Sequence, residues 1–341
     1  MARVKMEDVA KLAGVSKSTV SQYLNKRYEY MSIETRQRIE QAIKETGYQR
    51  NVVARSLKVK KTHTIGVIVA NILHYFSTAI SRGIEDYCNK HGFNVIVCNA
   101  DDNPVKEREY IEMLLAKQVD GLILASTNEN NDLLKKLVEG GFPLVLVDRK
   151  LDGIEADGVF SNNVKASVDA ISHFIKLGHR SIALFSPAIK KLSQRKERYE
   201  GYLRALSQHH IEIQEQYIKF VDKISDTRKI ILELLHLPVP PTALFCTNDL
   251  TTIETLKVLK EEKVNIPSDI AVIGFDDSPW LQLLEPPLTT VVQQTYDMGV
   301  KSAELLLNKI ENPHSKHCTV HIMDCQLIVR ESCGFLRAGV D

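Results

Sequence analysis

The sequence predicts an α/β protein that carries a small helical domain at its N-terminal end. Residues 9–25 have the pattern of two short helices joined by a tight turn. From Thr64 onward, apolar runs alternate with helical patterns, and the alternation repeats in the second half of the chain. We therefore expect a three-helix helix-turn-helix domain followed by two doubly wound parallel sheets. The 341 residues are enough for two or three domains.

The helix-turn-helix pattern rests on its turn as much as on its helices. Val9, Ala10 and Ala13 recur at helical spacing. Gly14 can adopt the left-handed conformation that ends a helix, and Ser16 is a good N-cap for the next one. In such a unit the second helix enters the major groove of DNA. The alternative interpretation is a small helical hairpin with a solvated basic face.

The second helix has a polar and an apolar side. Lys17, Ser18 and Gln22 share the polar side near the helix start, which is the part that touches base edges in a helix-turn-helix unit. Val20 and Leu24 are expected to face inward. This division favours the DNA-binding interpretation over the plain hairpin.

The charge of the chain is divided unevenly. Residues 1–62 hold 14 Lys and Arg and 6 Asp and Glu, a net charge of 14 − 6 = +8. The remainder holds 44 − 14 = 30 basic and 43 − 6 = 37 acidic residues, a net charge of −7. Only the N-terminal segment is therefore suited to a polyanion such as DNA.

A third helix follows the helix-turn-helix pattern, with Ser32 as a cap and Gly47 as its end. Its expected apolar stripe consists of Ile33, Ile39, Ala42 and Ile43. Asn51 can cap one more short helix, but residues 51–58 form too few turns to be stable alone in water. Composition by itself favours a basic linker there.

Strands and helices alternate through the rest of the chain. Buried strands are expected at residues 65–70, 95–98, 121–125 and 143–147, and again at 181–186, 217–222, 243–247 and 270–275. Helices are expected to begin near Phe76, Pro104 and Asn130 in the first half, and after Asn163, Arg195, Ser225 and Asp249 in the second. Two such halves imply a cleft, and parallel sheets bind ligands beyond the carboxyl ends of their strands.

Polar residues follow several of the predicted strands. They are residues 71–77, Asp148 and Arg149, Asn162 and Asn163, Asn248 and Asp249, and Asp276 and Asp277. A single Asp after a strand is more often a helix cap, but several such sites on one rim favour a polyhydroxylated ligand. Tyr75, Phe76 and Trp280 are candidates for stacking on a sugar, although they also suit a core.

Several classes of protein are excluded by what the sequence lacks. Six cysteines are scattered without a Cys-x-x-Cys pair, and no His or Cys cluster has zinc-ligand spacing. We find no glycine-rich nucleotide motif and no nucleophile elbow. No apolar run is long enough for a membrane helix, and the first residues lack a signal-peptide pattern. We therefore expect a cytoplasmic protein that is not an enzyme and uses no metal, cofactor or membrane.

The residues also carry a resemblance to a known family. The matching segments are Asp8-Val9-Ala10, Ala13-Gly14-Val15-Ser16, Thr19-Val20-Ser21, Leu24-Asn25, Asn51-x-x-Ala54-Arg55-x-Leu57, Gly178-His179-Arg180, Arg198-x-x-Gly201-Tyr202, Asn248-Asp249, Gly274-Phe275-Asp276-Asp277 and Pro287-Leu288-Thr289-Thr290-Val291. In these segments the chain resembles the LacI/GalR family of bacterial transcriptional regulators over nearly its whole length. The resemblance implies a homodimer on double-stranded operator DNA and a periplasmic-binding-protein-like effector core.

The resemblance also implies roles for individual residues. The DNA-binding set would be Lys17, Ser18, Thr19, Ser21, Gln22, Asn25, Asn51, Ala54, Arg55 and Leu57. Residues 51–58 would form a hinge helix on the operator, with Leu57 wedged into the minor groove. The effector-binding set would be Tyr75, Phe76, Asp148, Asn162, Arg198, Asn248, Asp276 and Trp280. Gln22 stands where the family usually has Arg, and residues 71–76 lack its common Asn-Pro-Phe-Phe.

The expected domain boundaries follow from the same comparison of patterns. Residues 1–49 would bind DNA, residues 50–62 would form the hinge helix and linker, and residues 63–341 would form the effector core. Its N-subdomain would comprise residues 63–161 and 291–322, and its C-subdomain residues 162–290 and 323–341. The chain would cross between them near Asn162, Thr290 and Met323. No leucine heptad follows Val329, which favours a dimer.

The expected function is a repressor of carbohydrate catabolism genes that responds to a sugar or sugar acid. Basic residues in the segment 190–198, which includes Arg198, favour a carboxylated or phosphorylated sugar, for example of the ketodeoxygluconate kind, although a solvated helix start explains them equally well. Two alternatives are a family regulator controlled by a phosphorylated carrier protein and a sugar-binding protein without a DNA function.

Overall fold

The computed structural model describes residues 4–48, 61–313 and 317–334. The chain divides into two compact units, residues 1–62 and residues 63–341. The predicted hinge helix and its candidate residues Asn51, Ala54, Arg55 and Leu57 lie outside the described residues. No helix in the described ranges is long and apolar enough to cross a membrane.

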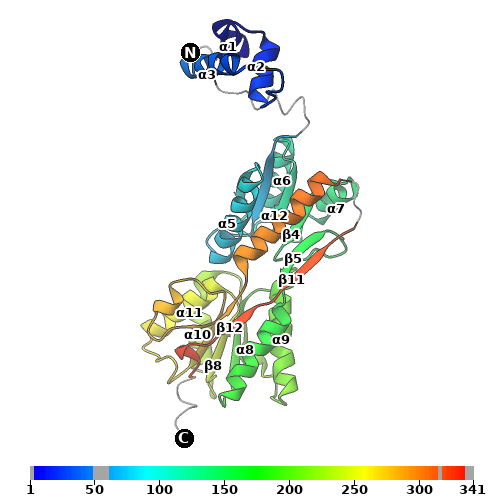
Figure 1. Cartoon of the computed structure of the whole chain (residues 1–341). Helices are drawn as coiled ribbons and strands as arrows, with labels where there is room; N and C mark the ends of the chain where they lie inside the picture. Colours follow the sequence, from blue (N-terminus) through cyan, green and yellow to red (C-terminus); the bar gives the residue numbers. More distant parts are fainter. Residues whose placement is uncertain (1–3, 49–60, 314–316, 335–341) are drawn as a thin grey trace. The chain divides into compact units, whose positions relative to one another are not determined.

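The described part of the first unit contains the helices α1 (Met6–Ala13), α2 (Lys17–Leu24) and α3 (Ile33–Thr46) (Figure 1). Gly14 ends α1 with a left-handed φ of 65°, which a side chain would disfavour. The hydroxyls of Ser16 and Ser32 cap α2 and α3 by accepting hydrogen bonds from the N–H groups of Thr19 and Thr35. The predicted helix-turn-helix is confirmed.

The core of this unit corrects one prediction. Val9, Val20, Ile39 and Ala42 are buried as expected. Ile33, however, is 73% exposed. At about 100° per helical residue, Ile33 lies about 180° around α3 from Ala42 and so faces solvent. Met31, just before the helix, occupies part of the core instead, while Ile43 packs at its edge.

The second unit contains two sheets. The first sheet has the strand order β11-β5-β4-β3-β1-β2, all parallel. Its strands are β1 (Thr64–Val69), β2 (Asn94–Asn99), β3 (Gly121–Leu124), β4 (Leu144–Val147), β5 (Asp157–Ser161) and β11 (Val320–Met323). Its helices are α5 (Tyr75–Lys90), α6 (Pro104–Ala116), α7 (Asn131–Glu139) and α12 (Thr295–Glu311).

The second sheet has the order β12-β10-β9-β8-β6-β7, in which only the edge strand β12 is antiparallel among the described strands. Its strands are β6 (Ile182–Pro187), β7 (Ile218–Val221), β8 (Ala243–Cys246), β9 (Ala271–Phe275), β10 (Thr289–Val292) and β12 (Gln326–Ile328). Its helices are α8 (Asn163–Lys176), α9 (Ser193–Gln208), α10 (Thr227–Leu235) and α11 (Asp249–Glu261). Each sheet has a buried apolar cluster on both faces.

The chain passes from sheet to sheet after β5, after β10 and between β11 and β12. The second passage follows Val292, close to the expected Thr290, because β10 pairs with β9 and keeps residues 289–292 in the second sheet. Beyond it, α12 runs beside α5 in the first half (Figure 1). Gly83 and Gly299 allow this approach, since a Cβ at either glycine would collide with a backbone carbonyl of the other helix.

Candidate functional site

The first candidate site is the outer surface of α2. Lys17, Ser18 and Gln22 are exposed there, while Val20 on the opposite side is fully buried. The ammonium of Lys17 lies 2.9 Å from the carboxylate of Glu7 in α1. Both side chains are well exposed, so this ion pair adds little stability and leaves Lys17 available to a stronger anion. The surface of α2 thus has the polar groups that the sequence predicted.

The other predicted residues of this surface are less exposed or already form hydrogen bonds within the protein. Thr19 and Ser21 are half-buried, and Asn25 is exposed with its side-chain amide donating to the carbonyl of Ser21 at 2.8 Å. The hydroxyl of Ser16 lies within hydrogen-bonding distance of Ser18 and Thr19, at 2.6 and 2.8 Å. These contacts fix the start of α2, where helix N–H groups attract anions such as phosphate.

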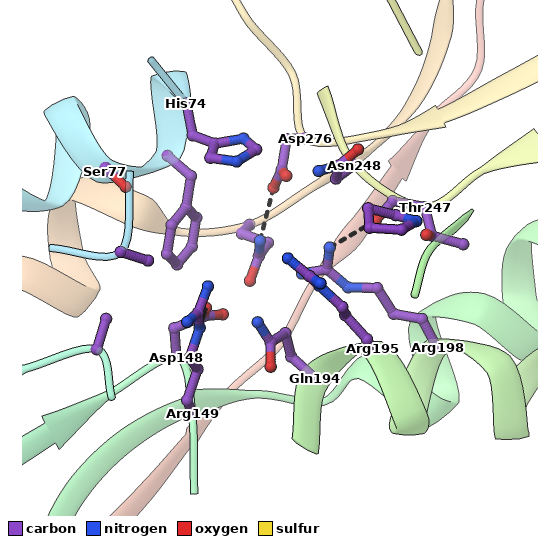
Figure 2. Close-up of a pocket in the computed structure, with 15 residues that line it drawn as sticks. His74, Ser77, Asp148, Arg149, Gln194, Arg195, Arg198, Thr247, Asn248 and Asp276 are labelled. Carbon is purple, nitrogen blue, oxygen red and sulfur yellow. Dashed lines mark hydrogen bonds and ion pairs between the residues drawn. The ribbon is translucent and has the colours of Figure 1, made fainter. Parts of the chain in front are cut away.

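The second candidate site is a pocket between the two sheets of the second unit (Figure 2). Its cavity volume is about 50 Å³, so the pocket is narrow. The residues that line it are Ala70, His74, Phe76, Ser77, Ala125, Asp148, Arg149, Pro187, Gln194, Arg195, Arg198, Thr247, Asn248, Asp276 and Gln293. They follow strands of both sheets or begin helices, as expected for parallel sheets.

Arg198 is the most firmly held cation of the pocket. It is 5% exposed and reaches inward from α9. Its Nε donates to the side-chain oxygen of Asn163 at 2.9 Å. Its Nη1 donates to the carbonyl of Thr247 at 2.7 Å, which Figure 2 shows as a dashed line. Its guanidinium lies 3.6 Å from the ring centre of Phe275. Three fixed contacts therefore orient it before any ligand arrives.

Two carboxylates face the pocket from the two sheets. Asp148 follows β4 and Asp276 follows β9, both with left-handed φ angles, 67° and 75°. Burial raises the pKa of Asp148, and burial together with Asp249 raises the pKa of Asp276 to about 6 although Arg198 opposes this. Gln293 donates to Asp276 at 2.6 Å. Two carboxyl groups whose ionised forms are destabilised by burial, both facing one cavity, are typical of a functional site.

Several polar atoms of the pocket walls form no hydrogen bond with the described residues, although the Nε of Arg149 lies 3.6 Å from the carboxylate of Asp148. The Nε of Arg149, the side-chain oxygen of Gln194 and the hydroxyl of Thr247 are buried without a hydrogen bond among the described residues. A buried unpaired donor or acceptor costs about 1–3 kcal/mol, so such atoms indicate a missing ligand or water. Donors and acceptors both occur among them, as a ligand rich in hydroxyl groups requires.

Two contacts of Asp249 join the two halves beside the pocket. His74, just before α5, meets the carboxylate of Asp249 at the start of α11 through its Nδ1. The N–H of Tyr75 donates to the other oxygen of Asp249 at 2.9 Å. Polar contacts beside the pocket therefore connect the two halves.

The structure brings five of the eight predicted effector residues to the pocket wall, namely Phe76, Asp148, Arg198, Asn248 and Asp276. It does not bring Tyr75, Trp280 or Asn162 there. Tyr75 packs edge to face on the half-exposed Trp280 with ring centres 5.8 Å apart. Asn162 bonds Asp324 and the N–H of Cys325 at the passage between the sheets.

Other wall residues lie outside the predicted effector set, among them His74, Arg149, Gln194, Arg195 and Gln293. Of these, His74 and Arg149 belong to the polar residues after predicted strands from which the sequence favoured a ligand site. Gln194 and Arg195 lie in the first turn of α9, within the basic segment 190–198, but no local pattern distinguishes them from its solvent-facing residues.

Comparison with known proteins matches both units of the chain to described domains. Residues 5–51 match the description "Bacterial regulatory proteins, lacI family", and residues 171–333 match a periplasmic-binding-protein-like domain. EndR of Paenibacillus polymyxa, named as a probable HTH-type transcriptional regulator, is 45% identical over 92% of each chain. The chain belongs to the lacI family of bacterial regulatory proteins. The HTH-type transcriptional regulator KdgR of Bacillus subtilis is 35% identical over 96% of this chain and 97% of its own.

Solved structures confirm the fold of this family member. The complex of the transcriptional regulator CelR with cellobiose matches with a TM-score of 0.72 and 29% identity, over 97% of this chain and 100% of CelR. The lac repressor dimer bound to operator and an anti-inducer matches with a TM-score of 0.86 and 24% identity, over 97% of this chain and 99% of its own. The protein is thus a transcriptional regulator of the lacI family and not an enzyme.

Proposed function

We propose that this regulator represses carbohydrate catabolism genes by binding a palindromic operator as a homodimer in the cytoplasm, and that a small polyhydroxylated effector in the pocket controls the binding. The observation that supports an effector most strongly is the buried, unpaired polar lining of the pocket around Arg198. A ligand that bridges the two halves can change their arrangement and with it the affinity for DNA.

Exposed apolar side chains support the homodimer. Ile72 and Leu73 after β1, and Trp280 and Leu283 after β9, are exposed, and the contact of Tyr75 with Trp280 joins the two loops. Neighbouring large apolar side chains in water are typical of a surface that another protein covers. In a twofold dimer the same patch is buried on both copies.

The pocket favours an uncharged sugar over an anionic one. The sequence suggested an anion because segment 190–198 is basic, but two of its cations have carboxylate partners. Lys191 pairs with Glu129 at 2.9 Å and Arg195 with Asp102 at 3.0 Å. The relative CelR has a solved complex with cellobiose, and cellobiose is an uncharged sugar. A sugar acid remains the second candidate because Arg149, Arg195 and Arg198 all reach the pocket.

The two alternatives make different predictions for the same experiment. A regulator controlled by a phosphorylated carrier protein would bind operator but ignore small ligands. A sugar-binding protein without a DNA function would bind a sugar but no operator, which the net charge of +8 on residues 1–62 argues against.

The test is a search for operator and effector together. Operator half-sites are selected from randomised duplexes, and binding is then measured by fluorescence anisotropy with neutral sugars, sugar phosphates and sugar acids. Arg198→Ala should still bind operator and lose its response to the effector, because it removes a pocket contact and none to DNA. The control is Arg204→Ala on the same helix, which removes an exposed side chain paired with Glu200. A normal response of Arg198→Ala would remove the pocket from the mechanism.

A further inference from the structure

One carboxylate links two arginines from opposite halves of the second unit. Asp102 follows β2 in the first half. One of its oxygens lies 2.7 Å from Nη1 of Arg149, which follows β4 in the same half. The other oxygen accepts a hydrogen bond at 3.0 Å from Nη2 of Arg195, which lies on α9 of the other half. Asp102 is therefore an ion-pair partner on both sides of the cleft.

The backbone holds Asp102 in this position. Asp101 and Asp102 both have left-handed φ angles, 54° and 51°, which non-glycine residues rarely adopt. The N–H of Asp102 donates to the carbonyl of Ala70 at 2.8 Å. Burial raises the pKa of Asp102, but the guanidinium groups of Arg149 and Arg195 outweigh it and lower the pKa below the ordinary value. The carboxylate is thus held ionised between its two partners.

This arrangement determines how much positive charge the pocket offers to a ligand. Arg149 and Arg195 both line the pocket, whereas Asp102 is not among the lining residues. Without Asp102, Arg195 would lose its ion-pair partner, and Arg149 would keep only Asp148, whose carboxylate lies 3.6 Å from its Nε. With it, an anionic ligand would have to compete with a carboxylate that is already bound to both arginines.

We propose that Asp102 is a specificity-determining residue: it acts as an internal counter-anion for Arg149 and Arg195 and makes the pocket select uncharged polyhydroxylated ligands over carboxylated or phosphorylated ones. This inference rests on the proposed effector function of the pocket. It adds that the preference for an uncharged ligand depends on one carboxylate that does not itself touch the ligand.

The test uses inorganic phosphate as a probe, because phosphate needs no knowledge of the natural effector. Binding to the full-length protein is measured by calorimetry at constant ionic strength. Asp102→Asn should bind phosphate about tenfold or more tightly than the wild type, since it removes one unit charge beside two partly buried cations. Asp101→Asn is the matched control, because Asp101 is the neighbouring residue of the same turn and pairs with Lys106. It should bind phosphate like the wild type.

A second variant separates the pocket from the basic N-terminal unit. In Asp102→Asn combined with Arg195→Gln, the gain in phosphate affinity should be lost, whereas phosphate bound elsewhere would be unaffected. No gain in Asp102→Asn, or an equal gain in Asp101→Asn, would overturn the role of Asp102.

The same proteins distinguish this inference from the proposed function. If no sugar of the panel binds but Asp102→Asn gains phosphate affinity, the effector proposal fails and the charge role of Asp102 stands. If sugars bind and release operator but phosphate affinity does not change, the effector proposal stands and the role of Asp102 fails.

Discussion

Asp276 provides the sharpest stability prediction, because burial of its ionised carboxylate lowers the free energy of unfolding. Its pKa rises from the ordinary 3.8 to about 6, mainly through burial. At 1.36 kcal/mol per pKa unit, a shift of 6 − 3.8 = 2.2 units corresponds to about 3 kcal/mol of destabilisation once the group is ionised. Asp276→Asn removes this charge, and Asn tolerates the left-handed φ of 75° as well as Asp does.

The pH dependence follows from the sign of the shift. A carboxyl whose pKa is raised by folding costs no stability below about pH 4, and the cost grows as the pH rises through 6. Asp276→Asn should therefore be more stable than the wild type by about 3 kcal/mol at pH 8 and by about half of that at pH 5. Its response to the effector should be lost, because the carboxylate faces the pocket.

The assay is denaturant unfolding of the full-length protein at both pH values, following the transition of the second unit. Asp222→Asn, an exposed carboxylate in the same half, is the control and should change stability little at either pH. A lower stability of Asp276→Asn at pH 8, or a difference that does not vary with pH, would refute the reasoning.

Three further predictions concern DNA. Operator affinity should fall steeply as the salt concentration rises, because residues 1–62 carry a net charge of +8. The slope of log affinity against log salt should be about 0.9 per phosphate contacted. An affinity that does not change between low and physiological salt would contradict this. Gln22→Arg should shift one position of each half-site toward G·C by about 1–3 kcal/mol, and unchanged preference in a half-site selection would remove Gln22 from base readout. Leu57→Ala should keep effector binding but weaken operator binding and DNA bending, which a circular-permutation gel assay measures.

The sequence was sufficient to predict much of the fold because its signals are local. Gly14 and Ser16 define the turn of the first unit, and the apolar runs define most strands. The strand β5 was missed, since Asp157-Gly158-Val159-Phe160-Ser161 is short and polar at both ends although all five residues are buried. There, the N–H of Thr319 donates to Asp157 at 2.6 Å, a contact across 162 residues that no local pattern reveals.

The sequence predicted those pocket residues that directly follow the strands. Asp148 and Asp276 follow parallel strands, whose carboxyl ends form such sites. Tyr75 and Phe76 show the limit, because neighbouring residues of a helix point about 100° apart and only Phe76 reaches the wall. The pairing of Asp102 with Arg195, 93 residues apart in sequence, exists only once the two halves meet. Side-chain direction and long-range pairing therefore needed the structure.

The central claim is that occupation of the pocket and binding of the operator are coupled. The direct measurement is calorimetric titration of an effector from the sugar panel into the free protein and into the protein saturated with operator, together with operator affinity measured with and without that effector. The two affinities should change by the same factor, about fivefold or more, because coupling between two binding sites is reciprocal. Equal effector affinities for the free and the operator-bound protein would contradict it.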